Sequence, residues 1–163
     1  MTTDGSVGAP TDPPIFKAQN TPDAQRRVAA QARLYSDAKA LYFGRVAVIS
    51  VLAVASSTAA LLTADAARTA LGAGGGILLL ALSVVGGDVE KGRRLQAAAI
   101  QEEFDTAVFQ LQWNSMEAER PSSIVIARAA ERYRGEREKD WYPDTRGTHR
   151  PFDVLICQVS NLG

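Results

Sequence analysis

The sequence lacks the residues of which most self-contained chemical sites are made. Its 163 residues include one cysteine, Cys157, and one histidine, His149. A disulfide needs two cysteines, and a structural zinc site needs about four ligands drawn mostly from Cys and His. We therefore expect no disulfide, no metal site and no bound cofactor. We interpret Cys157 as a buried structural thiol and not as a nucleophile with His149 as its base.

The sequence also lacks an excess of charge of either sign, because 18 Lys and Arg balance 18 Asp and Glu. A binder of nucleic acid polymers normally has a basic excess, so this class is disfavoured. The acidic residues at positions 101–105 have no histidine nearby and are typical of a solvated helix face. We therefore predict no catalytic residues and no enzymatic activity.

Two stretches contain no charged residue at all, residues 46–64 and residues 69–87, each 19 residues long. As a helix, each would be about 28 Å long, which is close to the ~30 Å hydrocarbon core of a bilayer. Only four residues, 65–68, connect them, and so short a connection forces two helices to run antiparallel. We predict a two-span transmembrane hairpin over residues 46–87.

The basic residues are distributed unevenly around this hairpin. Only Arg68 lies between the two uncharged stretches, whereas basic residues gather on both outer sides. Those residues are Arg26, Arg27, Arg33, Lys39 and Arg45 before the first stretch, and Lys91, Arg93 and Arg94 after the second. Because basic flanks stay on the cytoplasmic side, we expect a multi-pass protein of the cell membrane with both termini in the cytoplasm.

The remaining chain is predicted to be helical apart from its start, which makes the fold class all-α. Residues 1–20 are rich in Pro and Gly and are expected to be a disordered tail. Thr21-Pro22-Asp23 is typical of a helix start, so an amphipathic helix over residues 21–45 leads into the first uncharged stretch. Residues 88–163 form a cytoplasmic helical region. It includes a helix from Pro121-Ser122-Ser123 to about Trp141, and residues 152–162 are left between helix and strand.

Both uncharged stretches are rich in small residues, and this leaves two alternatives open. A buried hairpin inside a soluble helical bundle would have a similar composition. In a membrane, Gly72 and Gly76 form a GxxxG pair that can lie in a helix–helix contact, within one chain or between chains of a homo-oligomer.

Aromatic residues gather outside the uncharged stretches. We expect Phe104, Trp113, Trp141 and Tyr142 to form one packed juxtamembrane cluster, because a short return after Pro143 can bring the two sets together.

The motifs around these aromatic residues resemble those of a known family. They are Ile100-Gln101-Glu102-Glu103-Phe104-Asp105-Thr106 with Val108-Phe109 and Leu111, then Trp113-Asn114, Asp140-Trp141-Tyr142-Pro143, Cys157-Gln158 and Ser160-Asn161-Leu162. In this combination the sequence resembles the SMODS-associated four-transmembrane effectors, which are pore-forming proteins of bacterial antiphage systems built around cyclic-oligonucleotide signalling. The resemblance extends from about residue 29 to the end of the chain.

The sequence departs from the family pattern at three positions. Gln110 and Gln112 stand where the family more often has Gly and Pro, and Val159 stands where Arg is expected. The family also has a second transmembrane pair after the Ser160-Asn161-Leu162 motif. We therefore expect this chain to correspond to the N-terminal half of such a protein.

The resemblance implies a membrane effector that disrupts the bilayer on receiving a cyclic-nucleotide signal from a neighbouring nucleotidyltransferase. Its partners would be the lipid bilayer, further copies of itself and that signal. The residues alone leave a second hypothesis open, a membrane anchor whose cytoplasmic helices recruit another protein.

Overall fold

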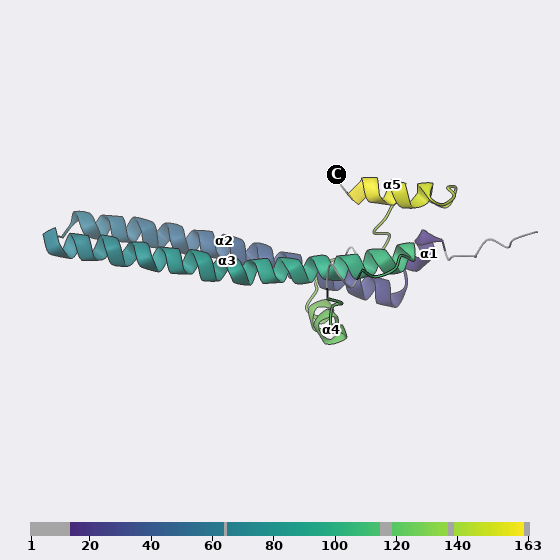
Figure 1. Ribbon diagram of the computed structural model, residues 1–163, viewed down its shortest axis with the longest axis horizontal. Coiled ribbons are helices and arrows are strands. Elements are labelled where there is room, and N and C mark those ends of the chain that lie inside the picture. The colour runs from purple at the N-terminus through teal and green to yellow at the C-terminus, as the bar shows by residue number, and fades with distance from the viewer. Residues whose placement is uncertain (1–13, 64, 115–118, 137–138, 162–163) are drawn as a thin grey trace, which may run out of the picture. The chain divides into compact units, whose positions relative to one another are not determined.

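The computed structural model describes residues 14–63, 65–114, 119–136 and 139–161. Over these residues the regular structure consists of helices alone, and the all-α prediction is confirmed. The helices are α1 (Ile15–Gln19), α2 (Pro22–Leu61), α3 (Asp65–Phe109), α4 (Ser123–Glu131) and α5 (Phe152–Asn161), shown in Figure 1.

The described residues divide into two compact units. The hairpin unit comprises residues 31–98, and the core unit comprises residues 14–30 together with 99–161. α2 and α3 each contribute residues to both units.

In the hairpin unit, α2 and α3 run side by side in opposite directions (Figure 1). At the turn, the Arg68 guanidinium donates hydrogen bonds to the carbonyl oxygens of Ala60 (3.0 Å) and Thr63 (3.1 Å). These bonds satisfy carbonyls that the end of a helix leaves without partners. Near the turn, a Cβ on Gly75 would lie 3.3 Å from the Ser56 Cβ, so the two backbones approach closely there.

The start of α2 agrees with the prediction, but the connection between α2 and α3 does not. The Thr21 hydroxyl accepts a hydrogen bond from the Ala24 amide (3.3 Å), as an N-cap residue does. The predicted connection at residues 65–68 is corrected, because α3 already begins at Asp65. The chain turns after Leu61 instead, and α3 then continues to Phe109 as one helix of 45 residues.

The prediction of a disordered tail is wrong for residues 14–20. The rest of that predicted tail, residues 1–13, lies outside the described residues. Residues 15–19 form α1, with Ile15 and Gln19 both 1% exposed. Ile15 is held in the core by apolar contacts, so this short segment is fixed by packing and not by its own helix propensity.

The end of α4 differs from the prediction, and the structure assigns a segment that the sequence left open. α4 begins at Ser123 as expected but ends at Glu131, well before Trp141. The charged residues that follow provide no apolar face for a longer helix to bury. Residues 152–161, which the sequence left unassigned, form α5, whose Asp153 and Cys157 are buried.

The hydrophobic core of the core unit joins five segments of the chain: α1, α2, α3, the segment that carries Tyr142, and α5. Its buried members are Ile15, Ala24, Val28, Phe104, Val108, Phe109, Tyr142 and Cys157. Burying each large side chain of this kind contributes about 1.5 to 3 kcal/mol. This packing fixes the positions of Asp105 and Tyr142.

Candidate functional site

The apolar surface of the hairpin unit is the first candidate for function. The most apolar stretches of α2 and α3 are long enough to cross a bilayer, and no part of either stretch is buried. Large apolar side chains point outward along both helices, with Val51 67%, Val54 68% and Ile77 71% exposed. The core helix of a soluble bundle would bury such residues, and no described part of this chain covers them.

The predicted glycine pair does not lie between the two helices of this hairpin. A Cβ added at Gly72 or at Gly76 would meet no described atom within 4 Å. The close approach is at Gly75 and Ser56 instead, because Gly75 is on the side of α3 that faces α2. A contact of Gly72 and Gly76 with another chain remains a prediction.

The second candidate is the aromatic cluster of the core unit. Phe104 and Tyr142 stack with ring centroids 5.9 Å apart, and Phe109 packs on Tyr142 at 5.0 Å. All three side chains are buried. The structure therefore brings two of the four predicted aromatic residues together, and it adds Phe109.

The other two predicted members do not join this cluster, which is a correction. Trp141 is 36% exposed, and Trp113 is half-buried with the Arg120 guanidinium 5.6 Å from its ring centroid. Tyr142 is buried in place of its neighbour because its backbone and its hydroxyl both find hydrogen-bond partners inside the unit.

The Tyr142 hydroxyl donates a hydrogen bond to Asp105 Oδ1 at 2.6 Å. Burial raises the pKa of Asp105 to about 6; the bond from Tyr142 acts in the opposite direction, and the nearby Glu102 carboxylate adds to the rise. Burial and the same hydrogen bond also raise the pKa of Tyr142. Asp105 therefore changes its charge close to neutral pH while Tyr142 stays protonated.

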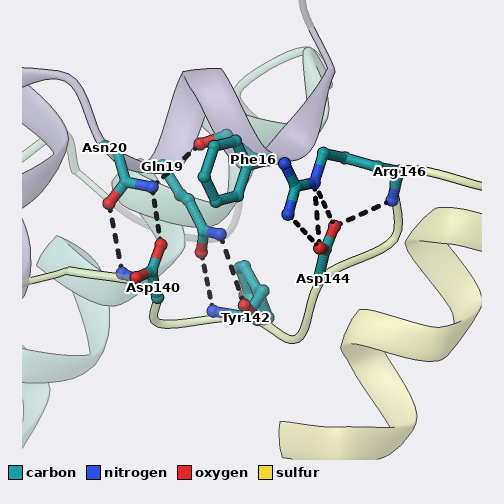
Figure 2. A network of polar contacts seen from close by, with 7 residues as sticks. All are labelled: Phe16, Gln19, Asn20, Asp140, Tyr142, Asp144 and Arg146. Atoms are coloured by element: carbon teal, nitrogen blue, oxygen red, sulfur yellow. Dashed lines mark hydrogen bonds and ion pairs between the residues drawn. The ribbon is translucent and has the colours of Figure 1, made fainter.

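Two amide side chains connect α1 to the segment that carries Tyr142 (Figure 2). The Tyr142 amide donates to Gln19 Oε1 at 2.7 Å, and Gln19 Nε2 donates to the Tyr142 carbonyl at 3.3 Å. Asn20 Oδ1 accepts a hydrogen bond from the Asp140 backbone amide (3.1 Å), and Asn20 Nδ2 donates to the Asp140 carboxylate (2.8 Å). Sequence reasoning missed Gln19 and Asn20, because no local pattern indicates a partner more than 100 residues away.

A cavity of about 350 Å³ lies beside Asp105 and Tyr142. Its lining combines residues of the separate motifs that resemble the family: Glu102, Asp105, Thr106, Phe109, Leu111, Tyr142, Gln158 and Asn161. Two carboxylates disfavour a phosphate group in this cavity, whereas the amides can bind neutral polar groups.

Among the described residues, no three His, Cys, Asp or Glu side chains gather as metal ligands. Cys157 is fully buried, and burial together with the Asp153 carboxylate raises the pKa of its thiol to about 11. The thiol is therefore protonated at neutral pH and a poor nucleophile.

Comparison with known proteins agrees with this description of the chain. A probable CBASS effector molecule of Bacillus cereus (strain VD146) is 34% identical over 80 residues, which cover 47% of this chain and 25% of that protein. No solved structure matches. The family described as "SMODS-associating 4TM effector domain" matches residues 13–163, nearly the whole chain. The chain therefore belongs to the family of SMODS-associating 4TM effector domains.

Proposed function

We propose that this chain is a multi-pass membrane protein that disrupts the bilayer, as the pore-forming part of an antiphage effector without enzymatic activity of its own. The observation that carries the proposal is the exposed apolar surface of the hairpin unit, where no part of the most apolar stretch of α2 or α3 is buried. Water is a poor solvent for so much apolar surface, and lipid is a good one.

The charges around the hairpin support one orientation. Arg68 is the only basic residue at the turn, whereas basic residues flank both outer ends of the uncharged stretches. By the positive-inside rule, the turn would face away from the cytoplasm and both chain ends would face it.

A conducting path would require several copies, or the further spans of a longer protein. Two helices packed side by side enclose no channel, so the hairpin has to associate with other helices. The open faces of Gly72 and Gly76 favour such an association, because small residues let helix backbones approach closely.

Membership of the family supports a cyclic oligonucleotide as the trigger. The cavity beside Asp105 is lined by two carboxylates, so we do not assign the phosphates of such a signal to it.

The test is dye release from vesicles. The full chain is reconstituted into vesicles of phosphatidylethanolamine and phosphatidylglycerol that contain a self-quenching dye, and cyclic dinucleotides and trinucleotides are added in turn. We expect release that depends on the protein and increases with one of these compounds. Stable insertion with no release under any condition would contradict the proposal and favour a membrane anchor that recruits another protein.

A further inference from the structure

A charged contact joins α2 and α3 just outside the two uncharged stretches, on the side away from the turn. Arg45 directly precedes the first uncharged stretch, and Glu90 follows the second. Arg45 Nη2 donates to Glu90 Oε2 at 2.8 Å, and Arg45 Nη1 donates to the Ser83 carbonyl at 2.9 Å. Glu90 is 7% exposed, so this ion pair is largely shielded from water.

Two glycines of α3 make room for the Arg45 side chain. A Cβ at Gly86 would lie 2.7 Å from Arg45 Cδ, and a Cβ at Gly87 would lie 3.2 Å from Arg45 Nη1. Arg45 therefore lies directly against the backbone of α3, and even a methyl group at position 86 would displace it. The contact depends on shape as well as on charge.

Glu90 has a second basic partner on its own helix. Arg94 Nη2 lies 2.7 Å from Glu90 Oε1, one helical turn away. A buried carboxylate left without a partner is strongly unfavourable, but here Arg94 stays bound if Arg45 leaves. The released Arg45 has a long, flexible side chain that can reach water. The contact between the helices can therefore break without leaving a buried charge unpaired.

We propose that the Arg45–Glu90 pair is a latch that holds α2 and α3 together next to the uncharged stretches, and that membrane disruption requires the latch to open. The inference rests on the proposed function, since it names how that activity is restrained. The three features that carry it are the partly buried contact between the helices, the glycine surface beneath Arg45 and the alternative partner of Glu90.

Three variants test the latch. Glu90→Gln removes the charge and keeps the shape, and Gly86→Ala displaces Arg45 without any change of charge. Arg93→Gln is the matched control, because Arg93 is an exposed basic residue next to Arg94 on the same helix. In the dye-release assay without an added trigger, we expect Glu90→Gln and Gly86→Ala to release dye about tenfold faster than the parent. Arg93→Gln should behave like the parent.

A second measurement reports on the hairpin without relying on dye release. The Cβ positions at residues 56 and 75 are 3.3 Å apart, close to the spacing of a disulfide. Ser56→Cys with Gly75→Cys should therefore crosslink quickly under mild oxidation in the parent, and severalfold more slowly when Glu90→Gln or Gly86→Ala is added. The oxidised crosslink should also suppress dye release, and reduction should restore it.

The outcomes separate the two proposals. Crosslinking at the parent rate in both latch variants would overturn the latch, and so would dye release that persists in the crosslinked hairpin. Crosslinking that slows as expected, with no dye release from any variant, would overturn the proposed function and with it the link between opening and disruption.

Discussion

Gln110, directly after α3, has a backbone conformation that is unfavourable for a residue with a Cβ. Gln110 has a positive φ of 58°, and the Leu111 amide bonds to the Thr106 carbonyl at 2.9 Å. This is the hydrogen bond of a Schellman motif, in which glycine is the usual residue at the left-handed position. The sequence departs from the family pattern at this residue, and the geometry gives a physical reason why glycine would suit it.

We expect Gln110→Gly to stabilise the core unit by about 0.5 to 1 kcal/mol. A left-handed conformation is unfavourable for a residue with a Cβ, and this gain exceeds the extra flexibility that glycine gives the unfolded chain. Chemical unfolding followed by tryptophan fluorescence measures the change. Gln112→Gly is the control, because position 112 has no positive φ and its substitution should bring no gain. Equal effects of the two substitutions would contradict the explanation.

The raised pKa of Asp105 predicts that the stability of the core unit depends on pH. Its pKa is about 6 in the folded protein and near 3.8 in the unfolded chain, so only the folded state holds the proton between these values. The unfolding free energy should therefore fall as the pH rises from about 4 to 6, and the loss is complete above pH 6. Allowing for partial exposure to solvent, we expect a loss of about 1 to 2 kcal/mol.

Asp105→Asn should remove this part of the pH dependence and stabilise the core unit at pH 7.5. The amide oxygen can still accept the Tyr142 hydrogen bond, but it carries no charge to desolvate. Thermal unfolding of the parent and the variant at pH 5 and pH 7.5 tests the prediction through the difference between the two proteins. The same difference at both pH values would show that Asp105 does not titrate in this range.

The short helix α1 depends on a contact with a distant part of the chain. Gln19 is 1% exposed, and its amide bonds to both backbone groups of Tyr142. We expect Gln19→Ala to destabilise the core unit by about 2 to 4 kcal/mol, because a buried backbone N–H and C=O would each lose a partner.

The matched control for Gln19→Ala is Lys17→Ala, an exposed position in the same helix. Its unfolding free energy should stay within about 0.5 kcal/mol of the parent value. Limited proteolysis provides a local readout, since cleavage near α1 should become faster in Gln19→Ala alone. If both variants resist protease like the parent, the amide contact does not hold α1.

The elements also show what the sequence could and could not predict. The start of α2 was predictable because Thr21, Pro22 and Asp23 act locally at a helix terminus. α1 was not predictable, since a helix of 5 residues forms only through tertiary contacts. Helical spacing placed Phe104 correctly toward Tyr142, but no periodicity governs the non-helical segment in which Trp141 turns outward. The motifs contain the residues that line the cavity, but the spacing of these residues along the chain does not predict that they lie together.

The hairpin unit has two distinct small-residue surfaces. Gly75 faces Ser56 within the chain, whereas Gly72 and Gly76 face open space. The first surface sets how closely α2 and α3 approach, and the second is free to meet another helix. A substitution on each surface should therefore have a different consequence.

We expect Gly76→Ile to weaken the association between copies by about tenfold or more while the hairpin itself still inserts. A β-branched side chain would hold two helix backbones apart, and nothing within the described chain opposes its presence. Gly75→Ile is the matched substitution one position earlier, and it should disrupt the hairpin because a Cβ at this position would lie 3.3 Å from that of Ser56.

Carbonate extraction measures insertion, and an amine-reactive crosslinker applied to intact membranes measures association. Gly76→Ile should remain in the membrane pellet without crosslinked species, whereas Gly75→Ile should be depleted from the pellet. Parental crosslinking in both Gly72→Ile and Gly76→Ile would show that this surface contacts lipid, and the copies would then have to associate through another face.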